Sequence, residues 1–298
     1  MKKIIPFVIV CLLMIACGQT ENEKHVRTRA EKARLDSIDK ASLKVGVMPT
    51  LDCLPVYLAK ESHIFEDLGV EVHLKYFTAH MDCDTALIGG SVEGSISELV
   101  RAEKLQEKGV ALDYPISTNT YWQLITGKRA RINELSQLSD KMIAMTRYSA
   151  TDKLSDIAIA KGKPKYDVYR VQINDVKVRL MMMLNHEMDA AWMTEPQASE
   201  AIANGHKKLM DSRDEDVQWG VFAFRKASMN SANRKKQLAL FIKAYDRAVD
   251  SINQKGVQHY GKLIAKYCGT HDKGIKALPK IHFQHAGKPN SIDINKVK

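Results

Sequence analysis

Between residues 43 and 108 the chain switches repeatedly between the hydrophobic spacing of a β-strand and that of an amphipathic helix. Short runs rich in β-branched residues predict strands at 43–48, 70–77 and 92–96. Helical spacing follows each run and predicts helices at 54–65, 79–88 and 97–108. This β-α-β-α-β order is typical of a parallel sheet whose strands are joined by right-handed crossovers.

A second series repeats the alternation further along the chain. Strands are expected at 141–145, 166–173 and 188–192, and helices at 151–161, 176–184 and 197–204. A strand at 219–224 and amphipathic helices at 234–255 and 257–266 follow. Two α/β units in series predict two lobes with a cleft between them. Because ligands of open α/β sheets bind beyond the carboxyl ends of the strands, one site is expected among the loops 49–55, 97–98, 147–152 and 193–196.

The N-terminus has the pattern of an export signal. Met1 and two lysines precede an apolar run at 4–16, which is too short to span a bilayer and has the length of a signal peptide. The run ends Met-Ile-Ala-Cys-Gly and resembles a bacterial lipoprotein box, with Cys17 as the lipidated residue. A plain secretory signal that retains a cysteine is the alternative. Residues 17–42 are charged and predict a flexible tether, part of which, about 29–38, could form an exposed helix.

Composition narrows the class of protein. The chain has 298 residues, 45% of them hydrophobic, which excludes a disordered chain and suits one large two-lobed domain or two medium ones. The formal charge of +10 comes from 45 Lys and Arg against 35 Asp and Glu, but the basic residues are scattered among acids. Nucleic-acid binding is therefore not expected. A single long apolar run excludes a polytopic membrane protein, and a monomer is expected.

Cysteine usage leaves the disulfide state open. Of five cysteines, Cys11 leaves with the signal peptide and Cys17 takes the lipid, so three remain in the body: Cys53, Cys83 and Cys268. An odd number allows at most one disulfide within the chain, and nothing local selects a pair.

The sequence offers no catalytic motif, and we expect no cofactor and no metal. There is no phosphate-binding P-loop, no GxSxG and no HExxH. The methionines at 181–183 are typical of core packing. His271, His282 and His285 lack the spacing of metal ligands on a helix.

Polar residues at the predicted strand ends are the candidate ligand contacts. In the first loop, Thr50, Leu51 and Asp52 either contact a ligand or cap the next helix. Ser97 and Glu98 follow the third strand, where Glu98 either points into the cleft or serves as a first-turn acid. Ser149, Ala150 and Thr151 open a helix, where free N–H groups and hydroxyls can bind an anion or a carbonyl, or simply cap the helix.

Four further candidates lie in the second α/β series or in the segment just before it. Asn174 ends a predicted strand, and Trp192 and Glu195 end another, where the indole could stack on a flat ligand or be buried. Tyr121 lies near the expected crossover and either lines the cleft or packs the hinge. If Asp52, Glu98 and Glu195 all point inward, their mutual repulsion favours a cationic or donor-rich ligand.

Several ordered motifs carry a resemblance to a known family. The segment LKVGVMPTLDCLPVYLAKESHIFEDLGVEVHLKYF at 43–77 contains a P-x-Y-x-A-K-x-x-x-x-F helix and a G-V-x-V strand. ALIGGSVEGSI at 86–96, LSDKMIA at 138–144 and EMDAAWMTEP at 187–196 follow in order. Together they resemble the substrate-binding proteins of ABC importers, in the nitrate, sulfonate and thiamine-precursor group. Glu93 stands where Asp is more usual in that group.

The resemblance implies a type II periplasmic-binding-protein fold, with two α/β lobes, a ligand cleft and two hinge crossovers. Lobe 1 would comprise 43–120 and 220–298, and lobe 2 would comprise 121–219. The implied function is a lipid-anchored receptor in the cell envelope that closes on a small molecule and delivers it to an ABC permease. The ligand would be a thiamine-precursor-like or amine-bearing compound. The alternatives are a nitrate- or sulfonate-type anion receptor, a surface receptor without a transporter, and a pyrimidine-synthesising enzyme, whose cysteine-rich motif is absent here.

Overall fold

A computed structural model describes residues 21–297 and divides the chain into two units, residues 1–42 and 43–298. The predicted signal peptide and Cys17 lie outside the described residues. The described part of the first unit is helix α1 (Glu21–Ala41), which is longer than the helix expected at about 29–38. Its Glu, Lys, Arg and Ala residues are strong helix formers, and Arg34 pairs with Glu31 at 3.2 Å. No helix in the described range 21–297 is long and apolar enough to cross a membrane.

The second unit contains two five-stranded sheets. The first has the strand order β2-β1-β3-β10-β4, in which β2 (Val72–Tyr76), β1 (Leu43–Val47) and β3 (Gly94–Glu98) are parallel. β10 (Gly220–Arg225) is antiparallel to both β3 and β4 (Leu112–Ser117). β4 was not predicted: its buried positions alternate as a strand requires, but its Pro115 is unfavourable in a sheet interior. β4 is an edge strand, where proline is tolerated.

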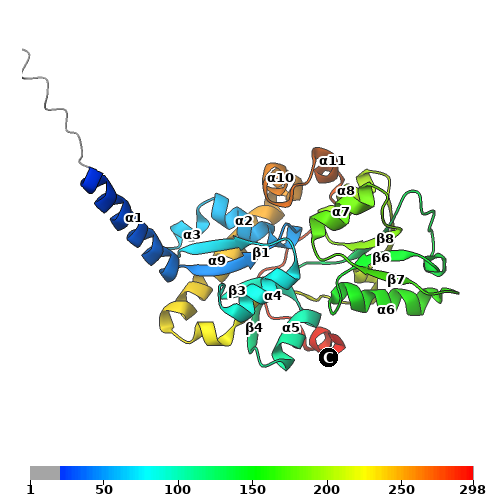
Figure 1. Ribbon diagram of the computed structural model, residues 1–298, viewed down its shortest axis with the longest axis horizontal. Helices are drawn as coiled ribbons and strands as arrows, with labels where there is room; N and C mark the ends of the chain where they lie inside the picture. Colours follow the sequence, from blue (N-terminus) through cyan, green and yellow to red (C-terminus); the bar gives the residue numbers. More distant parts are fainter. Residues whose placement is uncertain (1–20, 298) are drawn as a thin grey trace, which may run out of the picture. The chain divides into compact units, whose positions relative to one another are not determined.

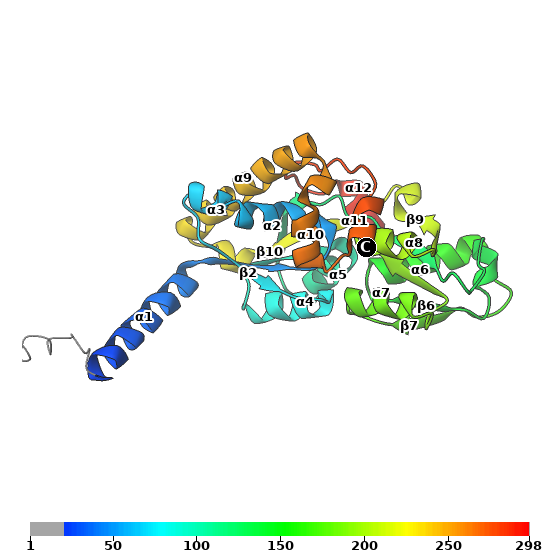
Figure 2. The same cartoon turned by 90° about the horizontal axis from the view of Figure 1, so that it is seen from above.

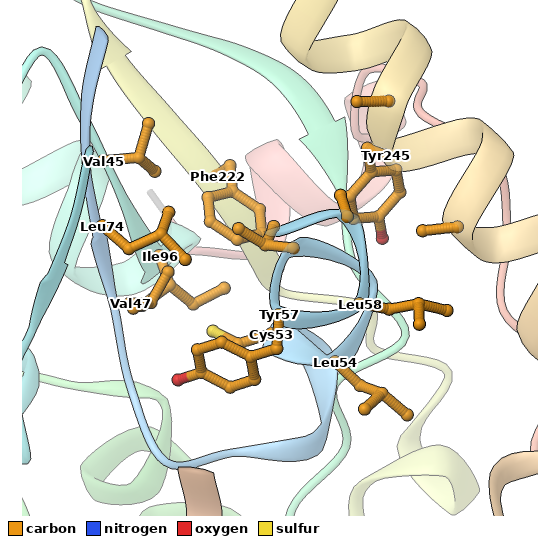
Figure 3. Packing of buried hydrophobic residues seen from close by; sticks show 14 of the residues in the cluster. Val45, Val47, Cys53, Leu54, Tyr57, Leu58, Leu74, Ile96, Phe222 and Tyr245 are labelled. Atoms are coloured by element: carbon orange, nitrogen blue, oxygen red, sulfur yellow. The ribbon is translucent and has the colours of Figure 1, made fainter. Parts of the chain in front are cut away.

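Helices cover both faces of this first sheet (Figure 2). One face carries α2 (Leu54–Glu61), α3 (Ile64–Asp67) and α9 (Ala232–Lys255), and the other carries α4 (His80–Gly89) and α5 (Leu99–Glu107). Between the sheet and α2 and α9, apolar side chains from the strands meet Tyr57, Phe222 and Tyr245 in one cluster (Figure 3). This packing fixes the carboxyl ends of β1 and β3, from which the candidate loops start.

The second sheet has the order β7-β6-β8-β5-β9. Its strands are β7 (Tyr169–Gln172), β6 (Met142–Met145), β8 (Ala190–Met193), β5 (Gln123–Thr126) and β9 (Lys207–Asp211). Helix α6 (Ala150–Gly162) covers one face, and α7 (Val176–Leu184) and α8 (Gln197–Ala203) cover the other (Figure 1). β5 and β9 were not predicted. β9 begins with two exposed lysines, which obscure the apolar pattern of a strand.

The sheets take their strands from different parts of the chain. The first draws on 43–117 and 220–225, and the second on 123–211, so the chain crosses between them twice. The predicted lobe boundaries at 120/121 and 219/220 fall in these two connections and stay a prediction. The paired α/β lobes themselves confirm the predicted fold class.

The C-terminal part contains more and shorter helices than the sequence predicted. The helix expected at 257–266 is a short 3₁₀ turn followed by α10 (Gly261–Cys268), and α11 (Asp272–Ala277) and α12 (Ser291–Val297) were not predicted. Helix α11 packs against α8, so the C-terminal segment of lobe 1 contacts lobe 2. Cys53, Cys83 and Cys268 are buried free thiols.

Candidate functional site

A pocket lies where the carboxyl ends of the strands of both sheets meet. It contains about 570 Å³ of space not filled by protein atoms, including its opening to solvent. Eight predicted ligand contacts line it: Thr50, Asp52, Glu98, Ser149, Ala150, Thr151, Asn174 and Trp192. The loops after β1, β3, β6, β7 and β8 therefore converge as the strand order predicts.

Asp52 supplies the first wall, in the 3₁₀ turn Leu51–Cys53 directly after β1. Its Oδ2 accepts hydrogen bonds from the hydroxyls of Thr120 and Thr118, the latter at 3.4 Å. Its Oδ1 is buried and has no hydrogen-bond partner among the described residues. Burial raises the pKa of this carboxyl group, although the threonine hydroxyls oppose the shift. Asp52 is therefore a buried carboxyl group with one acceptor atom left for a donor.

Ser149 and Thr151 supply the opposite wall at the start of α6. The Ser149 hydroxyl accepts the N–H of Thr151 at 3.1 Å, and the Thr151 hydroxyl accepts the N–H of Thr146 at 2.9 Å. Ser149 thus caps α6, Thr151 braces the preceding loop, and both side chains line the pocket. The capping role is therefore present for Ser149, and ligand contact by Ser149 and Thr151 stays a prediction.

Glu98 joins the two walls. One carboxylate oxygen accepts the N–H of Val100 at 2.7 Å and caps α5, while the other accepts the N–H of Ala150 at 3.0 Å. Because Ala150 is the first residue of α6, this second bond crosses from one lobe to the other. Burial raises the pKa of Glu98 to about 7, and the nearby Arg101 guanidinium limits the rise.

Arg179 and His80 line the pocket and were missed by the sequence analysis. Arg179 is buried and donates to neutral oxygens: the carbonyl of Trp192 at 2.8 Å, the hydroxyl of Thr146 at 2.8 Å and the carbonyl of Ile173. Desolvation lowers the pKa of Arg179 to about 10, so it stays protonated near neutral pH. Desolvation likewise lowers the pKa of His80 to about 3, which leaves the imidazole neutral. The sequence feature that could have indicated a buried, functional Arg179 is its position as the one arginine in the largely apolar helix α7.

Three of the four remaining predicted contacts lie beside this pocket. Leu51, Tyr121 and Glu195 line a second pocket, which shares Asp52 with the first. The Glu195 carboxylate is already bonded to the hydroxyl of Tyr121 at 3.1 Å, the amide of Gln123 at 2.9 Å and the N–H of Ser199 at 3.0 Å. These bonds give Glu195 a structural role in capping α8.

Ser97 and Trp192 are embedded in the core. Ser97 lines neither of these two pockets and pairs through its backbone with Val221. Trp192 lines the first pocket but is fully buried, and its indole N–H donates to the Ser155 hydroxyl at 2.9 Å. The geometry thus supports the buried alternative for Trp192 more than stacking on a ligand.

Direct hydrogen bonds also join the two lobes beside the pocket. Gln197 donates from Nε2 to the carbonyl of Pro49 at 2.6 Å, and its Oε1 is buried with no partner among the described residues. The N–H of Leu51 donates to the carbonyl of Glu195 at 2.8 Å. Together with the Glu98–Ala150 bond, these contacts join the two lobes across the pocket. Within residues 21–297, no group of three or more His, Cys, Asp or Glu side chains is placed to hold a metal ion.

Comparison with known proteins confirms the predicted resemblance. A sequence model of the NMT1-like family matches residues 36–260. No curated protein sequence matches the chain.

Solved structures share the fold at low sequence identity. The ligand-binding component of an ABC-type import system from Staphylococcus aureus, solved with zinc bound, superposes with a TM-score of 0.70 at 14% identity, covering 86% of this chain and 89% of the other. The alkanesulfonate-binding protein SsuA from Xanthomonas axonopodis, bound to MOPS, gives 0.69 at 16% identity over 86% and 89%. The nitrate-binding protein NrtA from Synechocystis gives 0.67 at 13% identity over 80% and 69%. By sequence and by fold, this chain belongs to the NMT1-like family.

Proposed function

We propose that this protein is a lipid-anchored solute receptor that captures a small molecule between its lobes and delivers it to an ABC permease. The family, the two-lobed fold and the polar pocket at the strand ends support this role. The sequence around Cys17 supports export and anchoring at the outer side of a bacterial membrane. Binding would proceed by hinge closure, since contacts from both lobes line the pocket.

The proposed solute carries N–H donors, as an amine or an aminopyrimidine does. The observation that carries this choice is a pair of buried acceptor atoms in the pocket, Asp52 Oδ1 and Gln197 Oε1, that have no partner among the described residues. A buried acceptor without a donor is destabilising by about 1–3 kcal/mol. A ligand that donates to both atoms would remove this penalty, and a cationic ligand would also neutralise Asp52.

Native mass spectrometry of protein purified gently from its host membrane tests the proposal. We expect a retained small molecule with at least one amine, amidine or ring N–H group. Calorimetric titration with an aminopyrimidine, a primary alkylamine, nitrate and methanesulfonate then ranks the ligand classes. A retained anion without donors would contradict the ligand class, and failure of every solute to bind would contradict the receptor role. Loss of fatty-acid labelling in Cys17→Ser would support the anchor.

The anion-receptor alternative has one observation in its favour. Arg179 and the N-terminus of α6 both line the pocket, and both are sources of positive potential. The donors of Arg179 are directed at oxygens of the protein, and the first amide of α6 is bonded to Glu98. We therefore rank this alternative second, and the titration with nitrate and methanesulfonate distinguishes the two.

A further inference from the structure

The N-terminus of α6 brings the positive end of a helix dipole to the edge of the pocket. The helix has 13 residues, and its first turn faces the pocket with Ser149 and Thr151. Such a terminus presents unpaired N–H groups and a positive dipole end to the solvent or to a ligand. Here a carboxylate of the same chain, that of Glu98 in the opposite lobe, accepts the N–H of the first helical residue at 3.0 Å.

We propose that Glu98 is a built-in anion that determines the specificity of the pocket, excluding anionic solutes and leaving the site complementary to donor-bearing ones. This inference rests on the proposed function, since it takes the pocket to be the solute site. It adds a specificity-determining residue and a mechanism for rejecting one class of ligand.

The position of Glu98 supports this assignment. Glu98 is 1% exposed, and both of its carboxylate oxygens accept hydrogen bonds from backbone amides, so the carboxylate is held in one place. A sulfonate or nitrate at the start of α6 would have to displace a carboxylate that is fixed at both ends. The negative charge of the Glu98 carboxylate would also repel this anion electrostatically.

The other positive groups near the pocket are similarly engaged within the protein. Arg101 donates from Nε to Asp84 at 2.8 Å, in an ion pair that is largely buried. Arg179 directs its donors at the oxygens of Thr146, Ile173 and Trp192. By contrast, acceptor atoms of Asp52 and Gln197 stay without partners in the described part of the chain. Of the residues that line the pocket, Arg179 directs its donors at protein oxygens, whereas Asp52 and Gln197 each keep an acceptor atom that no described residue pairs, which is the complement of a donor-rich ligand.

The charged groups around Glu98 influence its pKa, and this pKa determines the pH at which the test should be made. Arg101 on α5 favours the ionised form, whereas Asp84 on α4 disfavours it. The pKa of about 7 means that Glu98 is mostly ionised at pH 8. We therefore choose pH 8, where both the charge and the bulk of the carboxylate exclude anions.

The test replaces Glu98 with serine. In Glu98→Ser the short hydroxyl can still cap α5, but it no longer reaches Ala150. We expect methanesulfonate and sulfate to bind this variant at least about tenfold more tightly than the wild type in calorimetry at pH 8, the worth of one charge-assisted hydrogen bond. Glu61→Ser, which removes a carboxylate on the exterior of lobe 1, is the matched control and should gain nothing.

A second measurement locates the bound anion. Sulfate should shift the backbone amide resonance of Ala150 in Glu98→Ser and leave it unmoved in the wild type. If Glu98→Ser folds poorly, Glu98→Gln serves instead, because it keeps the shape and removes the charge, and it should show a smaller gain. The proposal is overturned if the folded variant gains no anion affinity, or if the wild type already binds methanesulfonate equally well.

Failure of this inference and failure of the proposed function give different results. A wild type that retains no solute, combined with a Glu98→Ser variant that gains sulfate binding, would contradict only the receptor role. A wild type that retains an amine, combined with a variant that gains no anion affinity, would contradict only the role of Glu98.

Discussion

At the scale of single residues, the pocket is built from polar groups that a stable interior would normally pair. Asp52 retains one oxygen without a partner among the described residues, and burial raises the pKa of its carboxyl group. Glu98 is in contrast bonded at both oxygens, yet it is buried deeply enough that its pKa also rises. The two carboxyl groups therefore differ: Asp52 keeps one oxygen without a partner in the described part of the chain, and Glu98 uses both oxygens within the protein.

Replacing Asp52 with asparagine should separate binding from stability. Asp52→Asn removes a buried charge, so the ligand-free protein should unfold at a higher temperature at pH 8, while affinity for a cationic solute should fall about tenfold or more. Thermal unfolding and calorimetry with the solute identified by mass spectrometry measure the two effects. Asp67→Asn, which alters an exposed carboxylate of lobe 1, should change neither. Unchanged affinity in Asp52→Asn would contradict the assignment of Asp52 to the ligand.

Glu98 should make stability depend on pH in a defined direction. Because its pKa is raised from 4.5 to about 7, the native state holds a proton that the unfolded state has lost in this interval. The free energy of unfolding therefore falls as the pH rises from 4.5 to 7 and levels off above, by at most roughly 3 kcal/mol.

Denaturant unfolding of the wild type and of Glu98→Gln across this pH range measures the effect. The difference between the two should decrease with rising pH, since the amide does not titrate. A difference that stays constant would mean that Glu98 keeps an ordinary pKa in the folded protein.

At the scale of elements, the site depends on helix starts that follow strand ends. Ser149 caps α6, Glu98 caps α5 and Asp175 caps α7, so three of the helices around the cleft begin with a side-chain hydrogen bond. Such caps stabilise a helix by about 1 kcal/mol. The same local geometry brings these polar side chains to the edge where the two sheets face each other.

The cap of α6 should matter for both folding and binding, because Ser149 also lines the pocket. Ser149→Ala should lower the free energy of unfolding by about 1 kcal/mol and also weaken solute binding. Ser231→Ala is the matched control, since Ser231 caps α9 by accepting the N–H of Arg234 at 3.1 Å, away from the pocket. It should cause a similar loss of stability with unchanged affinity. Equal affinity in both variants would restrict Ser149 to its structural role.

At the scale of the whole second unit, direct hydrogen bonds join the two lobes. The contacts of Gln197 with Pro49, of Leu51 with Glu195 and of Ala150 with Glu98 cross the cleft. Outside the pocket, α11 packs on α8, and His271 is bonded through its backbone N–H to the buried Glu200 at 3.2 Å. Opening of the cleft would have to break these contacts together.

Gln197→Ala should shift the ligand-free protein toward an open form. The variant loses the bond to Pro49, and one hydrogen bond of this kind is worth about 0.5–1.5 kcal/mol, which changes the ratio of open to closed molecules by up to roughly tenfold. Small-angle X-ray scattering should show a larger radius of gyration than for the wild type. Gln258→Ala removes a comparable bond to Leu278 within lobe 1 and should leave the radius unchanged. Identical scattering from both variants would contradict the role of Gln197 in closure.

Features that depend on neighbouring residues can be predicted from the amino-acid sequence alone. The alternation of strand and helix, the parallel order of β1, β2 and β3, and the start of α6 at Ser149 all follow from local periodicity and capping. Because side chains at strand ends meet at one edge of a parallel sheet, local patterns also brought eight of the predicted residues to one pocket.

The hydrogen-bond partners of those residues depend instead on contacts between segments that are far apart in the chain. The short strands β5 and β9 are stabilised by pairing with distant segments, so their own sequences indicate them weakly. Arg179 lines the pocket because α7 packs beside β8, and Glu195 is saturated by donors from three separate positions. Whether a carboxylate binds a ligand, a helix end or its own neighbours depends on which donors the fold brings within reach, and that is a property of non-local contacts.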